Sequence, residues 1–288
     1  MYDRYGPIPR FCFEFLEDDT RLNGHQARLQ TALSGLSSRV LSGLANGIFN
    51  FDKSDISHTI LLLKRLPGPD FTRTILGIIT PTIEMAIHNQ VRRETDAQRL
   101  ELYQALASVP VSRGLAGVAY EWSAQERLQQ QNPITVNLFP MERKVPSDLR
   151  KKTRWHSIHE GGATPLSINI ERTDVDAYGE KPDSIRDKVY YVPHKSNQVV
   201  HDSFIMDNNR LFIFQFTISD DYDIKEGLLE FFSQPSLPPR ANWYFIFVIP
   251  PDLLEFSCPE VDAMKEFLEE INLCSMVWDP QLGVVLNP

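Results

Sequence analysis

Seven consecutive apolar residues at 243–249, WYFIFVI, constrain the fold of this chain more than any other feature. Side chains alternate between the two faces of a β-strand, so a strand of this composition must be covered on both faces. Such a strand is typical of the centre of a sheet that has helices on its faces. We therefore predict that residues 243–249 form a central strand.

Other segments with strand or helix patterns surround this run. Segments rich in β-branched and aromatic residues predict strands at 134–138, 189–192, 199–206, 211–218 and 273–278. Helical spacing predicts helices at 111–128, 220–232 and 261–271. Asp207, Asn208 and Asn209 favour a hairpin turn between two of the strands, and a long loop is expected from 139 to 165. The order of these elements predicts an α/β fold with a mixed central sheet flanked by helices.

Residues 1–105 have a mostly helical pattern, which Pro67, Pro69 and Pro81 interrupt. No GxxxxGK[ST] sequence occurs, so a nucleotide site of that kind is not expected. A chain of 288 residues is long enough for two cores. We therefore predict two domains, at 1–105 and 106–288.

The formal net charge of -9 repels polyanions, so nucleic-acid binding would depend on a local basic patch. One strong cluster of basic residues exists, composed of Arg143, Lys144, Arg150, Lys151, Lys152 and Arg154. Neutralisation of phosphate groups is its functional interpretation. A solvated loop and a nuclear-import signal explain the same residues equally well.

The three cysteines form no CxxC pair, which favours a reducing compartment and argues against a zinc–cysteine site. His156 and His159 are expected in a loop rather than at a metal. No apolar stretch is long enough to span a membrane, and the first residues lack the pattern of a secretory signal. These features predict an intracellular protein, cytoplasmic or nuclear.

Polar residues interrupt the two strands of the expected hairpin. In residues 211–218, Gln215 and Thr217 share one face and the phenylalanines share the other. Asp202 lies in the preceding strand segment, and the hairpin brings it beside Gln215. Because Mg²⁺ prefers hard oxygen ligands, Asp202 is a candidate metal ligand.

An aspartate followed about a dozen residues later by a polar pair on the next strand resembles the PD-(D/E)XK nuclease motif, in its Crinkler/RHS variant, where the second strand contains Q-x-T. Gln215 and Thr217 match that pattern. Further matches in the same order are Tyr191-x-Pro193, Asn197, 223–228 (DIKEGL) and 245–250 (FIFVIP). The resemblance implies a restriction-endonuclease-like fold and an Mg²⁺- or Mn²⁺-dependent nuclease.

The resemblance extends to two segments nearer the N-terminus. Residues 113–121 are similar to the leading helix of the family, whose glutamate reaches the metal, which implies that Glu121 is a second metal ligand. Residues 5–10 resemble the segment that follows an ATPase region, so residues 1–105 are interpreted as the remnant after an ATPase and winged-helix region.

The first functional hypothesis is a metal-dependent nuclease with catalytic residues Asp202, Gln215, Thr217, Glu121 and Lys225, the last replacing the lysine of the family motif. Each residue also has a structural interpretation: Asp202 as a hairpin cap, Gln215 and Thr217 as sheet residues, Glu121 and Lys225 as exposed helix residues. The second hypothesis is an inactive nuclease-fold module that binds nucleic acid or a protein partner as an effector. The oligomeric state stays open.

Overall fold

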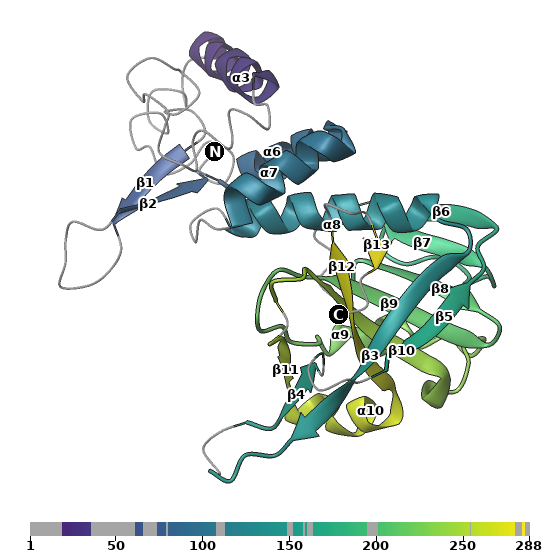
Figure 1. Cartoon of the computed structure of the whole chain (residues 1–288). Helices are drawn as coiled ribbons and strands as arrows, with labels where there is room; N and C mark the ends of the chain where they lie inside the picture. Colours follow the sequence, from purple (N-terminus) through teal and green to yellow (C-terminus); the bar gives the residue numbers. More distant parts are fainter. Residues whose placement is uncertain are drawn as a thin grey trace. The chain divides into compact units, whose positions relative to one another are not determined.

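The computed structural model describes residues 19–35, 61–65, 74–78, 80–107, 113–148, 152–157, 159, 164–194, 201–253, 255–279 and 284–285. The chain forms two compact units, Met1–Trp122 and Ser123–Pro288, whose positions relative to one another are not determined (Figure 1). The division between the units falls within helix α8 (Arg113–Gln130), between Trp122 and Ser123, and well after the expected boundary at 105.

The first unit contains α3 (Asp19–Ser34), α6 (Pro81–Arg93), α7 (Asp96–Ala107) and the beginning of α8. It also contains an antiparallel pair of strands, β1 (Leu61–Arg65) and β2 (Thr74–Ile78), which the helical pattern did not predict. β-branched and leucine residues dominate these two short segments, and pairing with a partner strand satisfies their backbone groups.

Local capping explains the ends of α6. The Ile83 N–H donates to Thr80 Oγ1 over 3.2 Å, and Pro81 occupies the first turn, where a missing N–H costs nothing. At the other end, the buried Arg99 donates from one guanidinium nitrogen to the carbonyl oxygens of Arg92 and Glu94. These bonds satisfy carbonyl groups that a helix end leaves without partners.

The second unit is built on one large mixed sheet. Its principal strands, in spatial order, are β11 (Ser257–Pro259), β4 (Arg154–Ser157), β3 (Ile134–Lys144), β12 (Asn272–Asp279), β10 (Trp243–Ile249), β9 (Arg210–Phe216), β8 (Ser203–Asp207), β7 (Val189–Pro193) and β6 (Asp174–Tyr178). Two more strands pair at its sides, β5 (Leu166–Ile170) with β3 and β13 (Val284–Val285) with β12.

Strand β10 is the predicted central strand. It runs parallel to both of its neighbours, β9 and β12. Six of its seven residues are buried, including Phe245, Ile246, Phe247 and Val248 from both faces. The prediction of a mixed α/β sheet with a doubly covered central strand is therefore confirmed.

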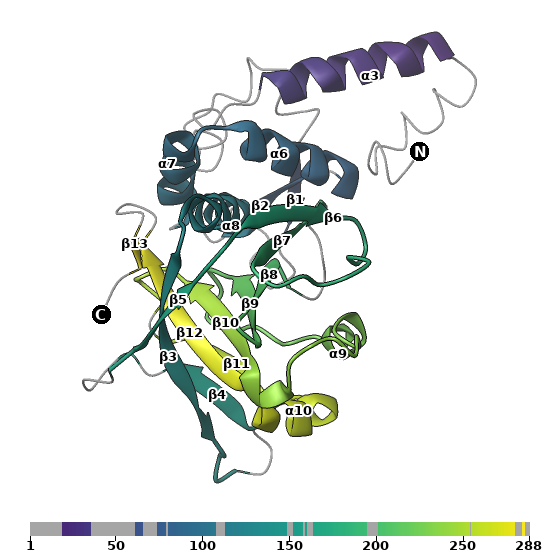
Figure 2. The same cartoon turned by 90° about the vertical axis from the view of Figure 1, so that its right-hand side faces the viewer.

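Helices α9 (Gly227–Phe231) and α10 (Lys265–Glu270) lie on the same side of this sheet (Figure 2). Together with the 3₁₀ turns Arg240–Asn242 and Asp262–Met264 they cover one face. Leu228, Phe231 and Phe267 pack there into the core that contains Phe245 and Phe247. The parts of the chain that the structure describes include no helix long and apolar enough to cross a membrane.

Backbone hydrogen bonds join the segment that follows β9 to β11, at the other end of the strand order. The chain leaves β9, and Asp221 then forms a parallel bridge with Ser257 of β11. The Ser257 N–H donates to the Asp220 carbonyl over 3.0 Å, and the Tyr222 N–H donates to the Ser257 carbonyl over 3.3 Å. Because β11 also pairs with β4, the order β9, β10, β12, β3, β4, β11 closes into a circuit.

Two sequence predictions are wrong in this region. The expected helix from Asp220 is only the five-residue α9, because Asp221 forms a bridge to β11 and the backbones of Asp220 and Tyr222 hydrogen-bond to Ser257. The expected loop from 139 to 165 contains the second half of the 11-residue strand β3 and all of β4, so His156 lies in a strand. Strand β11 is distant in sequence from Asp221 and from β4, the two segments with which it pairs, so local periodicity does not reveal those pairings. Strands β3 and β4, in contrast, pair with each other as near neighbours in the chain.

Candidate functional site

Asp202 and Gln215 meet at the open end of the β8–β9 hairpin. Ser203 pairs with Phe214, and the turn between the strands has Asn208 at φ 52° and Asn209 at φ 60°. Asparagine tolerates this left-handed conformation, which matches the twist of a two-residue hairpin turn. The Gln215 Nε2 donates to Asp202 Oδ2 over 2.6 Å, so the predicted convergence of these two side chains is confirmed.

The Asp202 carboxylate also terminates the backbone pairing of the hairpin. Its Oδ2 accepts a second hydrogen bond, 2.6 Å long, from the Phe216 N–H. The Asp202 N–H donates to the Phe214 carbonyl over 3.0 Å, and the Asp202 carbonyl accepts from Gln125 Nε2 of α8 over 2.9 Å. The aspartate is thus anchored through its side chain and through both of its backbone polar groups.

Burial dominates the electrostatics of Asp202, whose exposed fraction is 8%. Loss of hydration disfavours the charged form and raises the pKa of Asp202 to about 7, although the hydrogen bonds from Phe216 and Gln215 oppose the rise. Burial therefore favours the protonated carboxyl group over the carboxylate.

Several oxygen atoms around Asp202 have unused lone pairs. Asp202 Oδ1 accepts no hydrogen bond from any residue that the structure describes. Gln215 Oε1 and Gln125 Oε1 are buried and have no hydrogen-bond partner among the described residues. Carboxylate and amide oxygens are the ligand types that suit a hard divalent cation. Within the described residues there is no group of three or more acidic, histidine or cysteine side chains that could hold a metal.

Two further buried polar pairs flank Asp202 and were missed in the sequence. The Tyr178 hydroxyl lies 2.8 Å from His201 Nε2, and the Tyr190 hydroxyl lies 2.7 Å from Ser203 Oγ. Burial raises the pKa of both tyrosines and lowers the pKa of His201 to about 3. The signal that was available was the polar triplet His201, Asp202, Ser203 inside an otherwise apolar run.

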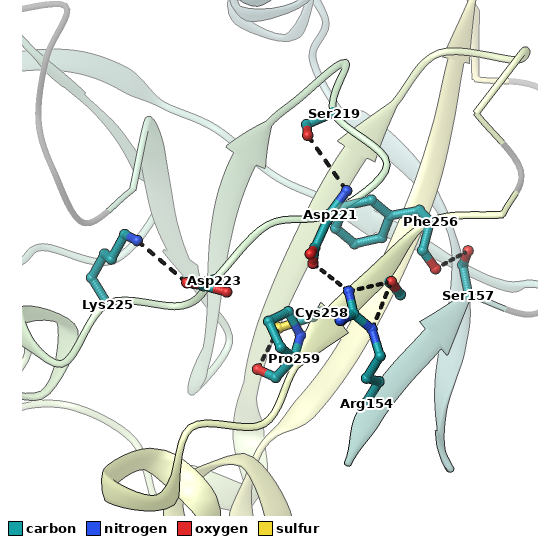
Figure 3. Close-up of polar contacts among 10 residues, drawn as sticks. Arg154, Ser157, Ser219, Asp221, Asp223, Lys225, Phe256, Cys258 and Pro259 are labelled. Atoms are coloured by element: carbon teal, nitrogen blue, oxygen red, sulfur yellow. Dashed lines mark hydrogen bonds and ion pairs between the residues drawn. The ribbon is translucent and has the colours of Figure 1, made fainter. Parts of the chain in front are cut away.

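The other predicted catalytic residues differ in their surroundings. Thr217 is buried, and its Oγ1 accepts from the Ser219 N–H over 3.0 Å, which shapes the turn after β9. Lys225 lies before α9 in an irregular segment, with its Nζ 3.8 Å from the Asp223 carboxylate (Figure 3). None of the described contacts joins Thr217 or Lys225 to Asp202.

Glu121 lies in the first unit, whereas Asp202 and Gln215 lie in the second. Because the two units are not placed relative to each other, its role as a metal ligand stays a prediction. The residue of α8 that contacts Asp202 is Gln125, four positions later in the chain. The sequence analysis did not single out Gln125.

Three described members of the basic cluster lie within ion-pair distance of a carboxylate, and the pairs of Arg143 and Arg154 are the short ones. Arg143 donates to both carboxylate oxygens of Glu260, over 2.6 and 2.8 Å. Arg154 lies 2.5 Å from the Asp221 carboxylate and donates to Ser257 Oγ (Figure 3). Lys144 is exposed and 3.9 Å from Glu142, and Lys152 is exposed. Arg150 and Lys151 lie outside the described residues.

The second unit thus defines a mixed α/β domain with a polar site at one end of a buried hairpin. Comparison with known proteins finds no matching family model, no similar curated protein and no similar solved structure. The arrangement of its own residues therefore carries the functional argument.

Proposed function

We propose that the second unit is a restriction-endonuclease-like domain that hydrolyses phosphodiester bonds with the help of Mg²⁺ or Mn²⁺. The observation that carries the proposal is the 2.6 Å contact between Asp202 and Gln215 at the end of β8 and β9. An aspartate and a polar residue on adjoining strands are the pair that the PD-(D/E)XK resemblance requires. The buried amide oxygens of Gln215 and Gln125 have no partner among the described residues, and both side chains contact Asp202 through Nε2, which supports a cation near Asp202.

Asp202 would hold the cation through Oδ1, since its Oδ2 is occupied by Gln215 and Phe216. The cation, when bound, would polarise the phosphate group and activate a water molecule. Gln215 orients the carboxylate, and Thr217 shapes the strand end that follows. Glu121 as a second ligand and Lys225 as the lysine near the phosphate remain part of the proposal.

In this proposal, nucleic acid contacts mainly those side chains of the basic cluster that are not already held in a short ion pair with a carboxylate. Lys144 and Lys152 are exposed, and Arg150 and Lys151 lie between them in the sequence. Arg143 and Arg154 would have to give up carboxylate partners to contact phosphate, so we assign them a smaller share.

A second candidate is an inactive module of the same fold that binds nucleic acid or a protein partner as an effector. The pairing of Arg143 and Arg154 with carboxylates favours it, as does the net charge of -9. Neutral residues at 215 and 217 also leave the site without the acid and base of the family motif.

Incubation of the purified chain with plasmid DNA or single-stranded RNA, in Mg²⁺ or Mn²⁺, distinguishes the two candidates. We expect metal-dependent cleavage that increases as the pH rises through about 7, because the cation competes with a proton for Asp202. The variant Asp202→Asn should abolish cleavage. Asp207→Asn is the matched control, since Asp207 is a buried carboxylate at the opposite end of the same hairpin.

Cleavage by the wild type and by Asp207→Asn, but not by Asp202→Asn, supports the nuclease. Cleavage that persists in Asp202→Asn removes this site from the mechanism. No cleavage of either substrate with either metal overturns the nuclease proposal and leaves the binding module, which nucleic-acid binding at varied salt then tests.

A further inference from the structure

Gln125 is a buried polar residue at a position where packing alone would favour an apolar side chain. Its exposed fraction is 1%, and its neighbours Ala124 and Leu128 on the second half of α8 are equally buried. One end of its amide is satisfied, because Nε2 donates to the Asp202 carbonyl over 2.9 Å. The other end, Oε1, has no hydrogen-bond partner in the part of the chain that the structure describes.

An unsatisfied buried carbonyl is costly, on the order of 1–3 kcal/mol. Leucine or methionine would fill a similar volume at this position without that cost. Burial of Gln125 therefore needs an explanation other than the stability of the helix on the sheet.

The explanation lies in how Asp202 is held. The Phe216 N–H donates to the Asp202 side chain, and the Asp202 backbone carbonyl is left to accept from Gln125. Because the Phe216 N–H donates to the Asp202 carboxylate, it is not available to the Asp202 carbonyl oxygen, and Gln125 Nε2 supplies the hydrogen bond to that oxygen. Without it, the Asp202 carbonyl would lose the only hydrogen bond that the described residues give it.

We propose that Gln125 is a positioning residue, which fixes the Asp202 backbone so that Oδ2 stays on Gln215 and Phe216 while Oδ1 is left for a ligand. The inference rests on the proposed function insofar as that ligand is a divalent cation. It adds a residue of α8 to the site, in a role that acts through Asp202 and not by contact with the substrate.

Two measurements on the full chain test the inference. The first is Mn²⁺ binding, and Gln125→Met should weaken it by roughly 10–100-fold, the usual effect of losing a residue that orients a metal ligand. The second needs no metal: amide hydrogen exchange at Phe216 should become faster, because its acceptor is no longer held. The control is Gln129→Met, which changes a half-buried glutamine of the same helix and should alter neither quantity.

If the methionine variant does not fold, both measurements are repeated on Gln125→Asn, which keeps the amide but shortens the side chain. Faster exchange at Phe216 with unchanged Mn²⁺ affinity would reveal a purely structural residue and overturn the inference. Unchanged exchange at Phe216 overturns it as well. If the wild type binds no Mn²⁺, the proposed function fails, and the exchange at Phe216 alone then decides whether Gln125 positions Asp202.

Discussion

The Arg154 guanidinium lies 2.5 Å from the Asp221 carboxylate and thereby joins β4 to the chain that follows β9. The same guanidinium donates to Ser257 Oγ from Nη2 over 2.8 Å and from Nε over 3.1 Å. Arg154 therefore contacts both of the segments that close the circuit of strands (Figure 3). A residue expected to dock phosphate is thus bonded to the segment between the candidate site and α9, and its role toward phosphate stays a prediction.

We expect Arg154→Met to lower the free energy of unfolding by about 2 kcal/mol, because it leaves the buried Ser257 hydroxyl without its donor. Asp221→Asn should cost less than about 1 kcal/mol, since the ion pair is partly exposed. Urea denaturation measures both. Arg186→Met, at the exposed ion pair with Asp176, is the control, and an equal loss there would contradict the role assigned to Arg154.

The buried hydroxyl pair of Tyr190 and Ser203 predicts strong coupling between two variants. Tyr190→Phe and Ser203→Ala should each cost about 1–3 kcal/mol, because each leaves the other hydroxyl unsatisfied in the core. The double variant should cost less than the sum of the two. Tyr244→Phe is a suitable reference, since this partly exposed ring stacks on Phe212. Additive losses from Tyr190→Phe and Ser203→Ala would exclude the coupling.

The hairpin turn predicts opposite effects for two substitutions at one position. Asn209 has φ 60°, in the left-handed region that glycine adopts without strain. Asn209→Gly should leave stability unchanged or raise it, whereas Asn209→Val should lower it by roughly 1–2 kcal/mol. Thermal unfolding of the two variants measures the difference. Equal melting temperatures would mean that the turn does not hold this conformation in solution.

The buried His159 predicts a pH dependence of stability. Burial lowers the pKa of His159 to about 4, whereas the unfolded chain takes up the proton near its ordinary value of 6.5. The stabilisation is therefore present above pH 6.5 and is lost as the pH falls from 6.5 towards 4. After allowance for partial solvent access, about 1 kcal/mol should be lost between pH 7 and pH 5.

His159→Phe removes the titrating group but keeps a ring against Phe139, so its stability should vary less over this pH range. Ser275→Ala is the matched control, because it removes the hydroxyl 3.1 Å from His159 Nε2 and leaves the histidine buried. It should lower stability at every pH and keep the wild-type slope. Denaturation curves with parallel pH slopes for the wild type and His159→Phe would refute the assignment.

Local sequence patterns were enough to predict those parts of the fold in which burial or a turn requires particular residue types at neighbouring positions. The seven apolar residues of β10 correctly predicted a strand that is covered on both faces, and the run Asp207, Asn208 and Asn209 correctly predicted the hairpin turn. From the alternation of side chains along that hairpin, the meeting of Asp202 with Gln215 also followed. Each of these features depends on residues close together in the chain.

Long-range pairing settled the rest. Glu260 is 117 residues from Arg143, and Ser257 is 103 residues from Arg154, so nothing in a local window shows that these basic residues already have partners. The same holds for Gln125, which is 77 residues from Asp202. Periodicity encodes which side of an element is buried, but the identity of the hydrogen-bond partner arises only when distant segments pack together.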